Sequence, residues 1–150
     1  MKTNYFRSAM ILPFFCMILF CSCKKGSSGN QGGNLATLSG NWQATVWGGA
    51  NDTARATISA SGTGTLTYLN AGAKTTNFSV NDVIFSAITS LGNGTYSCLG
   101  AYRYTVAGNS MLESTKATIT LQNNNQVMYV HYAEDASTGI TPPDYYWNRQ

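Results

Sequence analysis

The sequence has few of the residues on which most enzyme chemistry depends. Its 150 residues include six acids and a single histidine, His131. A protein zinc site needs three or four closely spaced ligands, and no second histidine or cysteine stands near His131 at such a spacing. Glycosidases need paired carboxylates, and one large class of serine hydrolases needs a Gly-x-Ser-x-Gly turn, which is absent here. We therefore expect no catalytic residue, no metal and no cofactor.

Positive charge is also scarce once the first 25 residues are set aside. The whole chain has nine Lys and Arg against six Asp and Glu, but Lys2, Arg7, Lys24 and Lys25 all lie near its beginning. The rest has five basic residues against six acidic ones. Because proteins that bind nucleic acids present a basic surface to the phosphates, we expect no nucleic-acid partner.

Cysteine is rare after residue 23, where Cys98 is the only one. It therefore has no partner for an intramolecular disulfide if the earlier cysteines are removed or modified. We predict a buried and inert thiol, the usual state of a free cysteine in an apolar setting. A reactive or intermolecularly bonded thiol is the alternative.

The first 22 residues have the layout of an export signal. Lys2 and Arg7 precede an uncharged and mostly apolar run over residues 9–20. A positive start followed by a short apolar segment is typical of a secretory signal. The run is shorter than the roughly 20 apolar residues that span a bilayer, and Pro13 interrupts it. We predict that residues 1–22 direct export.

The sequence Phe20-Cys21-Ser22-Cys23 resembles the end of a bacterial lipoprotein signal, in which a large apolar residue and small ones precede the modified cysteine. The resemblance implies that Cys23 becomes the lipidated first residue and carries acyl chains such as palmitate. It places the protein in the bacterial cell envelope, anchored to the outer membrane on its periplasmic or surface face. Ordinary secretion is the alternative. The Gly- and Ser-rich stretch that follows predicts a flexible linker over residues 23–34.

Residues 35–150 have the length of one domain, and their sequence pattern is typical of an all-β protein. Residues 53–60 alternate between apolar and polar side chains, which is the pattern of a half-buried strand. Further stretches of this kind are separated by turn-forming Gly, Asn and Ser. The strands so predicted are residues 65–69, 95–106, 116–121 and 127–132. Gly100 is expected to mark a bulge or bend in the longest of them.

One segment, residues 79–91, is ambiguous. Val83, Ile84, Ala87 and Ile88 stand at helical spacing behind a Ser79/Asp82 pair that would suit a helix start. Its composition is nevertheless rich in Val, Ile, Phe and Thr, which favour strands. We prefer a strand over residues 83–89, with the helix as the alternative, and assign its apolar side chains to the core in either case.

Several short antiparallel strands predict a small up-and-down β-barrel of about eight strands, with a β-sandwich as the alternative. Gly40 and Trp42 begin the first strand, and Arg149 lies at the end of the chain. This arrangement resembles the lipocalins, in which an early Gly-x-Trp sets an indole across the closed end of the barrel and a late arginine packs over it. The resemblance implies a lipocalin-like barrel over residues 35–150, in which Trp42 and Arg149 have structural roles.

Aromatic residues are the main candidates for a binding site. Tyr96, Tyr102 and Tyr104 share one face of a predicted strand, and with Tyr68 and Phe78 they form a candidate lining for a small apolar or amphipathic ligand. The alternative is that most of these rings simply fill the core.

Trp47 is a separate candidate. Alternation from Trp42 and Ala44 places it on the outer face beside two glycines, where it would contact an envelope protein or a glycan. Two functions follow: an envelope-anchored binding module for a small ligand, or a structural and interaction module without one.

Overall fold

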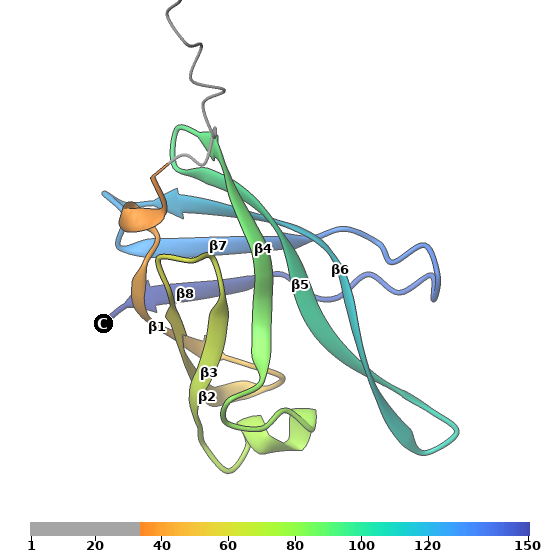
Figure 1. Ribbon diagram of the computed structural model, residues 1–150. Helices are drawn as coiled ribbons and strands as arrows, with labels where there is room; N and C mark the ends of the chain where they lie inside the picture. Colours follow the sequence, from red (N-terminus) through yellow and green to blue (C-terminus); the bar gives the residue numbers. More distant parts are fainter. Residues whose placement is uncertain (1–33) are drawn as a thin grey trace, which may run out of the picture.

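The computed structural model describes residues 34–150, in which eight antiparallel strands close into a barrel (Figure 1). The strands are β1 (Gly40–Val46), β2 (Ala50–Ile58), β3 (Gly64–Leu69), β4 (Val83–Gly92), β5 (Thr95–Val106), β6 (Asn109–Gln122), β7 (Val127–Tyr132) and β8 (Tyr145–Arg149). Two short 3-10 helices, η1 (Leu35–Thr37) and η2 (Ala73–Thr76), accompany them. The predicted signal, Cys23 and nearly all of the linker lie outside the described residues.

Each strand pairs with the next along the chain, and β8 returns to pair with β1. Every strand thus has two neighbours, which removes the exposed edges that an open sheet would have. The prediction of an all-β, up-and-down barrel of about eight strands is confirmed, and the alternative sandwich is wrong. Since all eight strands lie between residues 40 and 149, the described residues hold a complete barrel with its core. Within residues 34–150, the structure contains no helix with the length and apolar character needed to cross a membrane.

The ambiguous segment forms β4, so the preferred strand assignment is confirmed. Its pairing with β5 shifts register between Ser86 and Thr89, and Ala87 takes a positive φ of 51° at this irregularity. Ile84 and Ile88 are buried, but Val83 and Leu91 are exposed. Val80 and Ala87 are exposed too, so the expectation that all of the segment's apolar side chains join the core was wrong for four of them.

Of the bulge or bend expected at Gly100, the bulge is absent, because the pairing of β5 with β6 runs through this residue without a shift. It instead makes room for Tyr132, a buried side chain of β7. A Cβ atom at residue 100 would lie 2.5 Å from Cε1 of the Tyr132 ring, too close for any real contact. The absence of a side chain at this position therefore lets a large ring fill the inside of the barrel.

The two ends of the barrel differ (Figure 1). One end, called here the closed end, carries η1, the turns before β3, β5 and β7, and the C-terminus. The opposite end, called here the mouth, is formed by the β1–β2 turn, η2, the β5–β6 turn and the loop between β7 and β8. The described chain begins at the closed end.

At the closed end, Trp42 is fully buried and donates a hydrogen bond from its Nε1 to the carbonyl of Leu38, at 2.9 Å. The guanidinium of Arg149 lies 4.3 Å from the centre of its ring. This is the packing that the lipocalin resemblance implies for the two residues. It covers this end of the barrel and leaves the mouth as the place for a pocket.

Candidate functional site at the barrel mouth

A pocket of about 260 Å³ lies at the mouth, between the strand ends and the loop that joins β7 to β8. We call it the mouth pocket. Its walls come from four separate stretches of the chain, which the fold of the barrel brings together. The lining residues are Trp47, Gly48, Thr76, Phe78, Ala101, Tyr102, Arg103, residues 140–143 and Tyr145.

Aromatic rings form the inner wall of the mouth pocket. The ring of Trp47 lies 5.5 Å from that of Phe78, 4.7 Å from that of Tyr145 and 5.1 Å from that of Trp147, measured between ring centres. Tilted and edge-on contacts at these distances add about 0.5–1.5 kcal/mol per pair to the burial of the rings. The rings therefore give the pocket a firm and apolar wall.

The prediction that Trp47 is an exposed contact residue was wrong, since only 2% of it is accessible. The pairing of β1 with β2 shifts between Ala44 and Val46, and both Thr45 and Val46 face outward. A bulge of this kind reverses the alternation that follows it. Trp47 therefore points inward, onto the same side as Trp42 and Ala44.

Tyr102 ties the loop between β7 and β8 to β5. Its hydroxyl donates to Oδ2 of Asp135 at 2.7 Å and lies 2.9 Å from the hydroxyl of Thr138. Asp135 also accepts hydrogen bonds from the amide and the hydroxyl of Ser137, at 2.8 and 2.6 Å. Hydrogen bonds from Ser137 and Tyr102 lower the pKa of Asp135, so its carboxylate form is favoured. The Tyr102 hydroxyl is thus engaged in holding the pocket wall.

The side chains of Trp47 and Arg103, which both line the mouth pocket, each hold a buried N–H group without a hydrogen-bond partner among the described residues: Nε1 of Trp47 and Nε of Arg103. The Arg103 guanidinium lies 5.3 Å from the centre of the Phe78 ring, and its Nη2 is 3.4 Å from Oδ2 of Asp82. Native proteins leave few buried polar groups unpaired, because each costs about 1–3 kcal/mol. Both N–H groups are buried, so they lie behind the pocket wall and not on its surface.

The other predicted ligand residues are spread over the barrel. Tyr96 and Tyr102 do share a face of β5, but six residues separate them by about 20 Å along a strand. Tyr96 is buried toward the closed end, and Tyr104 stacks on Tyr102 at 5.8 Å without lining the pocket. Of the five candidates, Phe78 and Tyr102 reach the mouth pocket.

Tyr68 was also wrongly predicted as a ligand residue. It lies on the outer wall, 43% exposed, with the guanidinium of Arg55 5.0 Å from its ring centre. The pairing of β2 with β3 skips Thr67, so Thr67 and Tyr68 both face outward while Leu66 and Leu69 are buried. As at Trp47, an irregular register reversed the alternation.

Arg103 lines the pocket, although strict alternation along β5 would place it on the face opposite Tyr102 and Tyr104. The pairing of β4 with β5 ends at Gly100, so β5 continues beyond it without a partner on that edge. Both faces of this extension then pack against loops, which brings Ala101, Tyr102 and Arg103 to the pocket together. No pattern in the sequence shows where a neighbouring strand stops.

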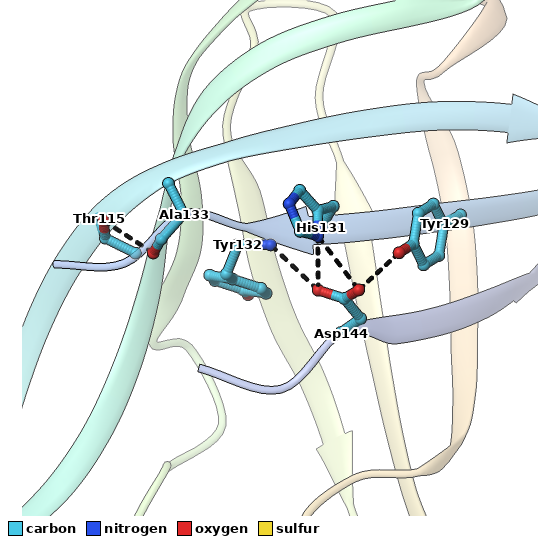
Figure 2. Close-up of polar contacts among 6 residues, drawn as sticks. All are labelled: Thr115, Tyr129, His131, Tyr132, Ala133 and Asp144. Carbon is cyan, nitrogen blue, oxygen red and sulfur yellow. Dashed lines mark hydrogen bonds and ion pairs between the residues drawn. The ribbon is translucent and has the colours of Figure 1, made fainter. Parts of the chain in front are cut away.

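A polar cluster on the outer wall centres on Asp144 (Figure 2). Its carboxylate accepts from the Tyr129 hydroxyl, contacts Nδ1 of His131 at 3.0 Å and accepts from the amide of Tyr132 at 3.2 Å. Partial burial acts to raise the pKa of Asp144, but these hydrogen bonds outweigh it and the pKa is lowered. The hydrogen bond to Asp144 raises the pKa of Tyr129 to about 12. The cluster fixes the start of β8 against β7.

His131 has an acid partner but no nucleophile. Among the described residues, no serine, threonine or cysteine side chain is hydrogen-bonded to its ring, and no three or more His, Cys, Asp or Glu side chains gather as metal ligands. Cys98 is buried, as predicted, and burial raises its thiol pKa to about 12. A thiol with that pKa is protonated near neutral pH and is a poor nucleophile.

A second hollow, of about 430 Å³, lies on the outer wall beside β1 and β8. Val46, Asp144, Tyr146 and Asn148 are among its lining residues. The Asp144 carboxylate in this hollow already takes part in the hydrogen bonds of the polar cluster on the outer wall. The mouth pocket is the stronger site, since its wall combines several aromatic rings with the side chain of Arg103.

Fold and site together define a small closed β-barrel with an aromatic pocket at one end. Comparison of the chain with protein-family models, with curated proteins and with solved structures gave no match. The resemblances to lipoproteins and lipocalins remain predictions from the motifs around Cys23, Trp42 and Arg149.

Proposed function

We propose that residues 34–150 are a non-enzymatic binding module whose mouth pocket holds a small apolar or amphipathic ligand. The observation that carries the proposal is the pocket wall of Trp47, Phe78 and Tyr145, combined with few polar groups. Ligand sites are typically concave, mostly apolar and furnished with a few placed polar groups. Known pockets range over about 300–1,000 Å³, so a volume near 260 Å³ favours a small ligand over a long-chain lipid.

A lipid anchor is the second part of the proposal. Cys23 would carry acyl chains, including palmitate, and hold the protein at a membrane of the bacterial envelope, with the outer membrane favoured. Several acyl chains give persistent attachment, whereas one myristoyl-length chain binds only marginally. Because the described chain begins at the closed end, the linker would reach the barrel there, and the mouth would face away from the linker.

An interaction module without a small ligand is the second candidate function. Trp47 no longer supports it, but Tyr146 is 57% exposed on the outer wall and lies 4.9 Å from the ring of Tyr129. An exposed ring beside a partly exposed one suits contact with an envelope protein or a glycan. Uptake of a small ligand at the mouth decides between the two functions.

Filling the mouth pocket is expected to block uptake of a small apolar probe. The barrel, prepared without residues 1–23, should take up N-phenyl-1-naphthylamine saturably, with a rise in the dye's fluorescence. Thr141 is an exposed residue of the pocket wall, so Thr141→Trp should fill the pocket and leave the core intact. We expect the dissociation constant to rise at least about tenfold, which corresponds to about 1.4 kcal/mol.

Thr67→Trp on the outer wall is the matched control and should bind the dye like the unchanged protein. Equal affinities for Thr141→Trp and Thr67→Trp would show that the dye binds elsewhere. No uptake by any form, with only empty protein in native mass spectra, would exclude the ligand-binding function and favour the interaction module.

The anchor is tested on the exported full-length chain. Labelled palmitate should be incorporated, and Cys23→Ser should abolish the label and move the protein from the membrane to the soluble fraction. Cys21→Ser is the matched control and should keep both label and location, because Ser22 is the small residue that precedes Cys23. A Cys23→Ser chain that retains the label would exclude Cys23 as the attachment site.

A further inference from the structure

The pairing between β1 and β8 ends before either strand does. Its last pair is Ala44 with Trp147, although β1 continues to Val46 and β8 begins at Tyr145. The hollow of about 430 Å³ on the outer wall is lined by residues of both strands beyond that pair. We call it the outer hollow. It therefore lies where the sheet opens between its first and last strands.

An exposed aromatic ring borders the outer hollow. Tyr146 is 57% exposed and lines the hollow, whereas Tyr129, whose ring centre lies 4.9 Å from that of Tyr146, does not line it. Tyr129 is held in turn by its hydrogen bond to Asp144 (Figure 2). Tyr146 thus packs on a fixed ring and keeps accessible surface beside the hollow.

The polar groups of the outer hollow are uncharged or already paired. Thr45 and Asn148 are exposed, and neither side chain has a hydrogen-bond partner among the described residues. Asp144 is the one charged side chain of the described lining, and it already takes part in the polar cluster on the outer wall. No Lys or Arg of residues 34–150 lines the hollow. An anionic ligand would therefore find no positive partner there.

A neutral sugar matches this combination of groups. Hydroxyl and amide groups both donate and accept hydrogen bonds, so Thr45 and Asn148 suit the hydroxyls of a sugar. A pyranose ring with equatorial hydroxyls presents flat faces of C–H groups, which carry a partial positive charge from the neighbouring oxygens. Such a face is attracted to the negative face of an aromatic ring such as Tyr146. The volume of the hollow also lies within the range of known ligand pockets.

A protein partner fits the outer hollow less well. Protein interfaces depend on a cluster of apolar anchors that become fully buried. Val46 and Tyr146 are the large apolar side chains of the hollow that are exposed, and the hydroxyl of Thr45 and the amide of Asn148 also line it. Two apolar side chains among uncharged polar groups favour a sugar over a protein surface.

We infer that the outer hollow binds a neutral glycan with flat sugar rings, which stack on Tyr146 and form hydrogen bonds with Thr45 and Asn148. The inference rests on the interaction module, the second candidate function, and gives it a site and a partner. It does not depend on ligand uptake at the mouth. The two cavities are neighbours, but Tyr146 and Asn148 line the outer hollow alone.

Three tetrasaccharides with the same β-1,4 linkage test the inference: cellotetraose, chitotetraose and tetraglucuronate. The first two are neutral and distinguish a glucan from a chain of N-acetylglucosamine. Calorimetric titration of the barrel without residues 1–23 should show saturable binding of at least one of them. Tetraglucuronate adds a carboxylate to each ring and should bind at least about threefold more weakly, because it meets Asp144 and no positive group.

Variants assign the binding to the outer hollow. Tyr146→Ala should weaken binding of the neutral tetrasaccharide at least about tenfold, whereas Tyr146→Phe, which keeps the ring, should stay within about threefold of the unchanged protein. Asn148→Ala should weaken binding at least about threefold. Tyr68→Ala is the matched control, because Tyr68 is also an exposed tyrosine of the outer wall but does not line the hollow. It should bind like the unchanged protein.

Failure of both neutral tetrasaccharides to bind would overturn the inference. So would binding that survives in Tyr146→Ala, once a thermal melt shows this variant to be folded, or tetraglucuronate binding as tight as that of the neutral chain. If both sugars fail but Tyr146→Ala loses an envelope protein that the unchanged barrel retains, the interaction function stands with a protein as its partner. Dye uptake at the mouth, measured on the same samples, reports separately on the ligand-binding function.

Discussion

Replacing Trp47 with alanine is expected to lower the free energy of unfolding by about 3–5 kcal/mol, the usual cost of emptying a large aromatic site in a core. The side chain is 2% exposed and contacts the rings of Phe78, Tyr145 and Trp147. Its loss would leave a hole joined to the mouth pocket. Urea unfolding followed by circular dichroism measures the change.

Two matched variants make this result specific. Thr45→Ala, at an exposed position two residues earlier, should change the free energy by no more than about 0.5 kcal/mol. Trp47→Phe, which keeps a ring, should cost clearly less than Trp47→Ala. Equal stability of the Trp47→Ala and Thr45→Ala proteins would indicate that Trp47 lies on the outer face, as alternation predicts. Trp47 would then not form the inner wall of the pocket.

Trp47 and Tyr68 show where sequence reasoning failed. In both strands the period-two pattern is sound up to an irregular register, after which every side chain lies on the opposite face. Nothing in the residues Thr45 or Thr67 marks the irregularity. The positions of such shifts depend on how neighbouring strands must bend to close the barrel, which is a property of the whole sheet.

The strands themselves could be predicted well, because each depends on local alternation and turn residues. β5 spans the predicted residues 95–106, and β4 follows its strand-favouring composition over its helical spacing. The mouth pocket could be predicted only in part. Tyr102 and Asp135 are 33 residues apart in the sequence, and no short-range pattern indicates that their side chains meet and hold a pocket wall.

Trp42→Ala is the second large effect, with an expected loss of about 3–5 kcal/mol in the free energy of unfolding. Trp42 is fully buried, and its Nε1 satisfies the carbonyl of Leu38 beside η1. Arg149 crosses its ring and donates to the carbonyls of Ser39, at 3.1 Å, and Asn125, at 2.9 Å. Arg149→Met should cost about 1.5–3 kcal/mol, because hydrogen bonds from a charged donor are lost along with the cation–π contact.

Arg55→Met is the control for Arg149→Met. It shows how much stability is lost when an arginine is removed from an aromatic ring that does not lie at the closed end. Arg55 lies 5.0 Å from the ring centre of Tyr68, similar to the 4.3 Å of Arg149 over Trp42, but on an exposed wall. Its loss should therefore change stability by about 0.5 kcal/mol or less. If Arg149→Met were as mild as Arg55→Met, the arginine would not be holding the closed end. If it is severe while dye uptake by the folded protein is unchanged, the closed end stabilises the barrel and the mouth alone admits the ligand.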